Sequence, residues 1–162
     1  MKQQNCDSKI KKVLVIFILV TFIILVLDQL TKYFMVKILT TRTNAINIIR
    51  DYLRLNLVFN PNLIWGIPLR NYFTYYFLPL IGVGFVIYLG IKAFTKFEAI
   101  IWGLILAGAL GNFIDRVRLG YVIDFIDMGI CKYRWPTYNL ADSALVIGML
   151  LLVIKIVFVK GK

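Results

Sequence analysis

Four long apolar segments divide this chain, and polar stretches separate them. They run over residues of about 13–36, 72–91, 99–114 and 140–159. A helix that crosses a membrane needs about 20 mostly apolar residues, so each segment predicts a transmembrane helix. The first segment is long and no small-residue cleavage site follows it, which argues against a cleaved signal peptide. We expect a membrane α-helical fold in which residues 1–162 form a single integral membrane domain.

The polar stretches on one side of the predicted membrane are longer than a plain connection requires. They cover residues 37–71 and 115–139. Apolar side chains recur at every second position within the first stretch, at Leu53, Leu55, Leu57 and Phe59. This period of two predicts a β-strand with one apolar face, and residues 121–128 predict a second strand. We expect a small β-sheet and surface-loop subdomain on the outer side of the membrane.

The composition agrees with a membrane protein and excludes several other classes. Apolar residues make up 60% of the chain and charged residues 17%, against about 45–50% and about 25% in soluble domains. The net charge is +11. The basic residues that produce it lie mainly at segment ends and in loops, where contact with anionic lipid headgroups is a better explanation than nucleic-acid binding. The chain has no histidine, which excludes Ser-His-Asp and Cys-His catalysis and histidine-dependent zinc motifs. The two cysteines, Cys6 and Cys131, show no metal-ligand spacing.

The basic residues are shared equally between the two sides of the predicted membrane, so their count does not decide the orientation. The lysine cluster directly before the first span, at Lys9, Lys11 and Lys12, favours a cytoplasmic N-terminus. Because four spans return the chain to its starting side, we expect both termini in the cytoplasm and the two long loops outside.

The acidic residues carry the strongest chemical signal. Five of the eight lie at or near span ends on the same predicted side of the membrane, namely Asp28, Asp115, Asp124, Asp127 and Asp142. A carboxylate beside hydrocarbon is costly and is functional by default. Several carboxylates that meet there indicate either paired acid–base chemistry or a cation site.

Structural roles compete with this interpretation for single residues. Asp28 and Lys32 lie four positions apart on one helix face, where they would neutralise each other. Asp142 falls in the first turn of the last helix, where the helix dipole favours an acidic side chain, and Asn139 is placed to cap that helix. Each residue alone is a weak signal, whereas the set of five is not.

Four blocks of residues resemble the signature blocks of the lipoprotein signal peptidases (signal peptidase II), in the same order and at similar spacing. The first is D-Q-L-T-K at 28–32 and the second is G-A-L-G-N-F-I-D-R-V at 108–117. The third is V-I-D-F at 122–125 and the fourth is Y-N-L-A-D-S at 138–143, with Tyr in place of Phe. Together they extend over most of the chain.

A fifth block departs from the family pattern N-x-G-x-A-F. Asn60 matches its asparagine, but Asn62 replaces the glycine, Ile64 the alanine and Trp65 the phenylalanine. Asparagine is the best substitute for glycine where a positive φ is needed. The two bulkier side chains are expected to reshape the substrate groove and to change inhibitor fit, without changing the chemistry.

The resemblance implies a bacterial inner-membrane aspartyl protease that removes signal peptides from diacylglyceryl-modified prolipoproteins by cutting before the lipidated cysteine. It places the catalytic pair on Asp124 and Asp142. We keep Asp127 as the second candidate if Asp124 is not catalytic. It implies membrane lipid contacts, globomycin-type inhibitors, a monomer, and no nucleic acid, cofactor or metal. The matching substrate-binding and supporting residues are Asp28, Lys32, Asn60, Gly111, Asn112, Asp115, Arg116, Asn139 and Ala141.

The chemistry of such a pair is coherent. Two carboxylates a few ångströms apart do not both ionise easily, so they share one proton. The ionised carboxylate then takes a proton from water, and the protonated one polarises the scissile carbonyl. The dipole of the last helix favours negative charge on Asp142, and we expect Asp142 to be the ionised member.

Two other functions stay open at this point. A metal-dependent membrane lipid transferase would use Asp115, Asp124 and Asp127, although the D-x-x-D-G opening of the CDP-alcohol phosphotransferases is missing; loss of activity with a chelator would support it. A small ion-conducting or transporter subunit would use Asp28 in an ion path, which counterion flux in liposomes would reveal.

Overall fold

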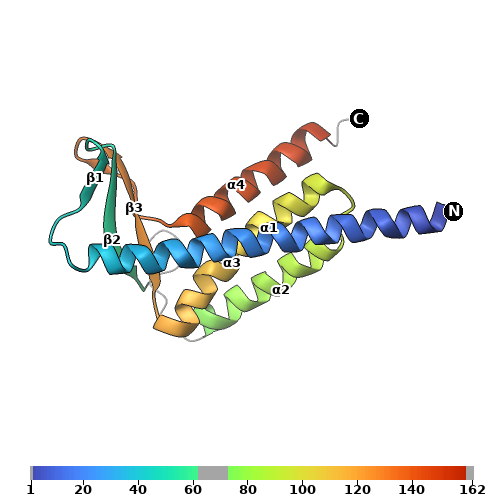
Figure 1. The fold of residues 1–162 in the computed structure, drawn as a ribbon, viewed down its shortest axis with the longest axis horizontal. Helices are drawn as coiled ribbons and strands as arrows, with labels where there is room; N and C mark the ends of the chain where they lie inside the picture. Colours follow the sequence, from blue (N-terminus) through green and yellow to red (C-terminus); the bar gives the residue numbers. More distant parts are fainter. Residues whose placement is uncertain (1, 62–72, 160–162) are drawn as a thin grey trace.

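The fold is seen in a computed structural model, which describes residues 2–61 and 73–159. Four helical segments in that part of the chain are long and apolar enough to cross a membrane, as predicted. Their helices, labelled in Figure 1, are α1 (Lys2–Leu39), α2 (Leu78–Ile91), α3 (Lys96–Leu119) and α4 (Leu140–Ile154). A π-helical turn, Phe73–Phe77, leads into α2, and another, Lys155–Val159, follows α4.

Helix α3 is the centre of the bundle, and α1, α2 and α4 all pack against it (Figure 1). Glycines on α3 allow this close approach. A Cβ atom at Gly103 would lie 2.9 Å from the Val20 side chain, and one at Gly108 would lie 2.4 Å from the carbonyl oxygen of Ala141. Small residues at these positions therefore let neighbouring helices approach α3 closely.

The ends of α3 are set by local signals. Thr95 and Glu98 form a capping box at its start. Gly120, with φ of 79°, ends it in the left-handed conformation that glycine adopts at low cost. The helix therefore runs past Ile114, where the apolar segment stops. The prediction that residues from 115 onward belong to an outer loop is wrong for the last turns of α3, because Asp115 and Arg116 are buried against other elements.

A small antiparallel sheet lies at one end of the bundle (Figure 1). Its strands β1 (Ile46–Ile49), β2 (Leu53–Asn60), β3 (Val122–Ile130) and β4 (Tyr133–Arg134) follow one another in sequence order across the sheet. The two strands expected from the sequence correspond to β2 and β3. The sheet joins two segments far apart in the sequence, because β2 precedes α2 and β3 follows α3.

A β-bulge in β2 changes which of its side chains share a face. Leu55 pairs with Ile126, but the next pair is Val58 with Asp124, so one extra residue is inserted between them. Paired residues lie on the same face of a sheet. The prediction of one continuous apolar face is therefore wrong beyond the bulge. The extra residue turns Asn60, instead of Phe59, onto the face that carries Asp124.

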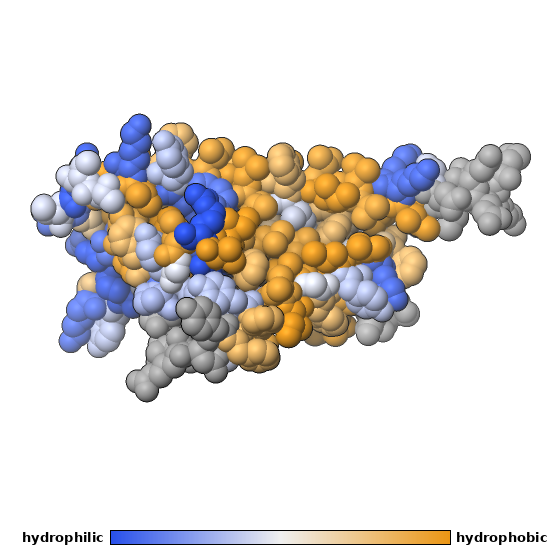
Figure 2. Space-filling view, turned by 90° about the horizontal axis from the view of Figure 1, so that it is seen from below, coloured by the Kyte–Doolittle hydropathy of each residue, from blue (hydrophilic) through white to orange (hydrophobic). Residues whose placement is uncertain are grey.

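The surface supports a membrane position for the helices. Figure 2 shows apolar side chains over the middle of the bundle, with hydrophilic residues gathered toward the end that carries the sheet. Large apolar side chains such as Phe22 and Phe85 are about 60% exposed on the helices. Exposure on this scale suits hydrocarbon and not water.

Candidate active site

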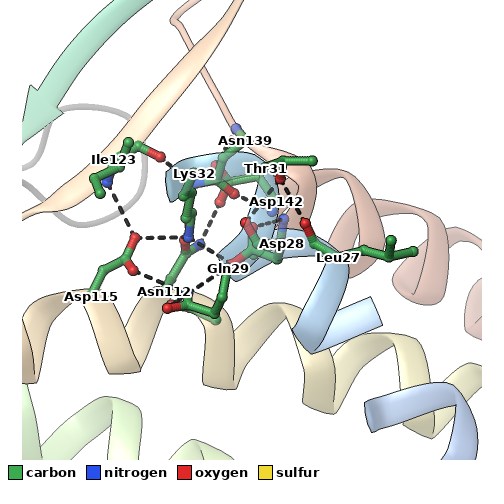
Figure 3. A network of polar contacts seen from close by, with 12 residues as sticks. Leu27, Asp28, Gln29, Thr31, Lys32, Asn112, Asp115, Ile123, Asn139 and Asp142 are labelled. Atoms are coloured by element: carbon green, nitrogen blue, oxygen red, sulfur yellow. Dashed lines mark hydrogen bonds and ion pairs between the residues drawn. The ribbon is translucent and has the colours of Figure 1, made fainter. Parts of the chain in front are cut away.

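Four segments meet at the end of the bundle next to the sheet, and each contributes polar side chains to one buried network (Figure 3). The contributing segments are α1, the last turns of α3, the first half of β3 and the start of α4. Seven of these side chains are at least nine-tenths buried: Asp28, Lys32, Asn112, Asp115, Arg116, Asp124 and Asn139. Buried polar groups on this scale need partners to offset their lost hydration.

A three-residue ion cluster forms the floor of the network. The Lys32 ammonium lies 2.9 Å from Asp28 Oδ2 and 2.8 Å from Asp115 Oδ2, and it donates to Asn112 Oδ1 at 3.2 Å. The expected neutralisation of Asp28 by Lys32 is confirmed, but the cluster extends from α1 to α3. Removing one partner from such a buried cluster typically costs about 3–5 kcal/mol.

The two carboxylates of the cluster each hold a neighbouring segment. Asp28 Oδ1 accepts a hydrogen bond from the Ala141 amide at 2.9 Å, which fixes the start of α4. Asp115 Oδ2 accepts one from the Ile123 amide at 3.2 Å, which fixes the start of β3. A Cβ at Gly111 would lie 2.5 Å from Asp28 Oδ2, so only glycine leaves room for this carboxylate. The cluster thereby positions the two segments that carry Asp124 and Asp142.

Two asparagines connect Asp124 to Asp142. The Asn139 side-chain amide donates to Asp124 Oδ1 at 2.8 Å and to Asn112 Oδ1 at 3.0 Å. The Asn112 amide in turn donates to Asp142 Oδ1 at 2.7 Å. Asn139 also begins α4 with a capping box, accepting from the Asp142 amide at 2.9 Å and donating its own backbone N–H to Asp142 Oδ2 at 3.2 Å. The prediction that Asn139 caps this helix is confirmed.

Asp124 has an environment that keeps it protonatable near neutral pH. Burial raises the pKa of Asp124 to about 6, and the negative charge of Asp142 acts in the same direction. Hydrogen bonds from Asn139 and from Asn60, the latter at 2.9 Å, act against this rise in pKa. The charge of Lys32 also acts against the rise, but from a distance, because all the hydrogen-bond donors described for this carboxylate are neutral amides.

Arg116 brings a second buried cation to the network. Its charge interacts with those of Asp142, Asp115 and Asp124. One guanidinium nitrogen donates to the Asn112 carbonyl oxygen at 3.2 Å, within the same helix. Among the described residues, its Nε is the only buried side-chain nitrogen or oxygen without a hydrogen-bond partner.

Asp127 lies apart from this network, although it is three residues from Asp124. Neighbouring residues of a strand alternate between faces, so Asp127 is on the opposite face of β3. There it forms ion pairs with Arg54 at 2.7 Å and Arg134 at 2.8 Å. Burial opposes its ionisation, but these two arginines prevail and lower the pKa of Asp127.

The structure thus brings together all the predicted site residues in its described part, with Asn60 reaching Asp124 from β2. The substitutions that depart from the family pattern, at Asn62, Ile64 and Trp65, lie outside the described residues.

Sequence reasoning missed Gln29, whose side-chain amide donates to Asp28 at 3.2 Å and to Asp115 at 3.1 Å. Its place directly after Asp28 in the first signature block was the available signal. Within residues 2–61 and 73–159, no group of three or more acidic or cysteine side chains is arranged to hold a metal ion.

Comparison with known proteins gives a consistent result. A family model described as signal peptidase (SPase) II matches residues 20–158. The chain is 39% identical to a lipoprotein signal peptidase of Thermodesulfovibrio yellowstonii over 135 residues, which cover 83% of this chain and 89% of the relative. It is 34% identical to a lipoprotein signal peptidase of Syntrophus aciditrophicus over 155 residues, which cover 91% and 95%.

Two solved structures, each described as a bacterial membrane enzyme, share the fold. One has a TM-score of 0.79 at 34% identity, covering 90% of this chain and 89% of its own. The other has a TM-score of 0.76 at 36% identity, covering 88% and 92%. Because the family match extends from α1 to the end of α4, the chain belongs to the signal peptidase II family, membrane proteases that remove signal peptides from lipoproteins.

Proposed function

We propose that this chain is an aspartyl endopeptidase of diacylglyceryl-modified prolipoproteins, which cuts on the N-terminal side of the lipidated cysteine. Asp124 and Asp142 are the catalytic pair. The single observation that carries the proposal is their connection through Asn139, which donates its side-chain amide to Asp124 and its backbone N–H to Asp142. One residue thereby orients both carboxylates.

The charges of the network favour a pair that holds one proton. Lys32 and Arg116 together offset Asp28 and Asp115, so the remaining charge is that of the pair itself. Two negative charges in this buried position would repel each other strongly, whereas one shared proton leaves a single charge. The hydrogen-bond donors and the dipole at the start of α4 stabilise that charge on Asp142. Asp124 then holds the proton, in agreement with its raised pKa.

The reaction follows from this proton arrangement. Asp142 takes a proton from a water molecule as the water oxygen bonds to the scissile carbonyl carbon, while Asp124 gives its proton to the carbonyl oxygen. The resulting tetrahedral diol collapses when Asp142 passes its proton to the leaving nitrogen and Asp124 recovers a proton from a diol hydroxyl. The C–N bond breaks, and both carboxylates return to their starting states.

The other residues of the network support this chemistry. Asn112 and Asn139 orient the pair, and Asn60 fixes the second oxygen of Asp124. Asp28, Lys32, Asp115, Gly111 and Ala141 hold the helix and strand ends in place. Arg116 places a positive charge beside the pair.

The site lies at the sheet end of the bundle. We assign this end to the outer face of the cytoplasmic membrane, with both termini in the cytoplasm. There the lipid chains of the substrate would lie against apolar helix faces and hold the peptide bond at the pair. Globomycin-type inhibitors are expected to bind there.

Cleavage of a lipid-modified prolipoprotein peptide by purified protein, in detergent with EDTA, tests the proposal. Wild type is compared with Asp124→Asn and Asp142→Asn, with Asp127→Asn as the matched control from the same strand. We expect cleavage before the lipidated cysteine by wild type, a loss of at least about 1,000-fold in both pair variants, and near-normal activity in the control.

Three outcomes would contradict the proposal in different ways. Activity that survives in Asp124→Asn but is lost in Asp127→Asn would move the catalytic role to Asp127. A requirement for a divalent metal would replace the aspartyl mechanism. Cleavage at another bond would leave the mechanism but change the substrate assignment.

A further inference from the structure

We propose that Tyr75 is a positioning residue that holds the Arg116 guanidinium beside the catalytic pair through the face of its ring. This inference rests on the proposed aspartyl mechanism. Tyr75 belongs to the π-helical turn before α2, within an apolar segment, and nothing in its sequence neighbourhood marks it as part of the site.

Arg116 lacks the restraints that usually fix a buried guanidinium. It is only 7% exposed, yet its described hydrogen bond goes to a backbone carbonyl of its own helix, and its Nε has no partner. The described ion pairs of Asp115 and Asp28 are with Lys32. A cation held in this way could pair directly with Asp142, since its charge interacts with that carboxylate. A direct ion pair with Arg116 would stabilise the ionised form of Asp142 and so hinder its uptake of a proton from water.

The ring of Tyr75 supplies the missing restraint. Its centroid lies 5.7 Å from the Arg116 Cζ, within the range of a cation–π contact. The side chain of Tyr75 is itself buried, so this contact is shielded from water. Cation–π contacts of this kind strengthen on desolvation, and they hold a guanidinium without neutralising it.

The hydroxyl of Tyr75 adds a second connection to the same site. It donates to the carbonyl oxygen of Gly120 at 2.6 Å. Gly120 is the left-handed residue that ends α3, and β3 begins two residues later at Val122. Tyr75 therefore fixes the turn that leads to Asp124 at the same time as it faces Arg116. The ring and the hydroxyl have separate tasks, which substitutions separate.

The test compares Tyr75→Phe, which keeps the ring, with Tyr75→Leu, which removes it. We expect kcat for the lipidated peptide to fall by about 5- to 30-fold in Tyr75→Leu, the size of a desolvated cation–π contact, and by less than about threefold in Tyr75→Phe. KM should change little in both. Phe77→Leu is the matched control, because it removes an exposed ring from the same turn. Equal losses in Tyr75→Phe and Tyr75→Leu, or no loss in either, would overturn the role of the ring.

A spectroscopic measurement on protein labelled with ¹⁵N-arginine tests the contact without substrate. The Nε–H proton of Arg116, assigned by its absence in Arg116→Lys, should be shifted upfield by the ring current in wild type and Tyr75→Phe, and should lose this shift in Tyr75→Leu. An unchanged resonance in Tyr75→Leu would contradict the proposal even if activity falls. Failure of the aspartyl mechanism is separately visible, because Asp124→Asn would then keep its activity while the resonance behaved as expected.

Discussion

Asp124 and Asp127 lie on the same strand, three residues apart, and the two faces of that strand give them opposite chemistry. Asp124 accepts hydrogen bonds from two neutral asparagine side chains, and burial raises its pKa to about 6. Asp127 is bonded to Arg54 and Arg134; burial opposes its ionisation, but the arginines lower its pKa. The residue type and the strand are the same, so the difference comes from the surroundings. Burial and the charge of Asp142 raise the pKa of Asp124, whereas two arginines outweigh the effect of burial at Asp127.

The comparison shows how a carboxylate is kept available for proton transfer. Asp127 stays ionised and connects β2, β3 and β4, because Arg54 comes from β2 and Arg134 from β4. Asp124 is as inaccessible to solvent as Asp127 but lies deeper in the protein, and its hydrogen-bonding partners fix its orientation without supplying a positive charge. A buried acid paired with amides instead of guanidinium groups is therefore able to exchange a proton at neutral pH, as general acid catalysis requires.

Without any substitution at the catalytic pair, the pH dependence of cleavage tests the special environment of Asp124 most directly. Because the pKa of Asp124 is raised to about 6, its proton is present below this pH and is lost as the pH rises above it. We expect kcat/KM of wild type to fall by about 50-fold between pH 6 and pH 8, as the protonated fraction of Asp124 drops from about one half to about one hundredth. Asp127→Asn should show the same profile. A rate that stays level up to pH 8 would mean that Asp124 does not act as the acid.

Giving Asp124 a cationic partner should remove the difference between the two faces. Asn60 donates to Asp124 at 2.9 Å, and Asn60→Lys would place an ammonium there, whereas Asn60→Gln adds length without charge. A cation favours the ionised carboxylate, so the alkaline fall in kcat/KM should move to lower pH in the lysine variant. At pH 6 we expect Asn60→Lys to be about 10- to 100-fold slower than Asn60→Gln. Equal profiles for the two variants would show that the charge of this partner is irrelevant.

The features that could be predicted from the sequence are those encoded locally. Four apolar runs of membrane length predict the four helices, and Asn139 with Asp142 three residues later predicts the start of α4. The end of α3 could not be predicted this way. Hydropathy falls after Ile114, but the helix continues because Asp115 and Arg116 become buried against α1, β3 and the turn before α2.

The missed features of the site depend on contacts between distant residues. The alternation in β2 is regular in the sequence, so nothing there reveals the bulge that turns Asn60 toward Asp124. The difference between Asp124 and Asp127 depends on Arg54, which lies 73 positions from Asp127. Tyr75 reads as one more apolar residue of a span until its ring is seen beside Arg116. Such features are set by tertiary pairing, which local propensity does not record.

The smallest effect on activity, and a clear one on stability, is expected from Asp127→Asn. The two arginines would lose their shared carboxylate, and we expect the free energy of unfolding to fall by about 1–2 kcal/mol at pH 6, since both arginines are partly exposed. Because the pKa of Asp127 is lowered on folding, the ion pairs stabilise wild type above the unfolded-state pKa of about 4 and are lost as the pH falls through the lower folded-state value. Thermal unfolding in detergent should therefore separate the two proteins at pH 6, and the separation should shrink progressively as the pH is lowered below about 4. Asp51→Asn is the control, because Arg134 contacts only the backbone carbonyl of Asp51 and this substitution keeps it.

The activity of Asp127→Asn decides whether the two faces of β3 are chemically separate. If this variant stayed folded but lost as much peptidase activity as Asp124→Asn, the two faces would not be separate. The contrast between their carboxylates would then not explain catalysis.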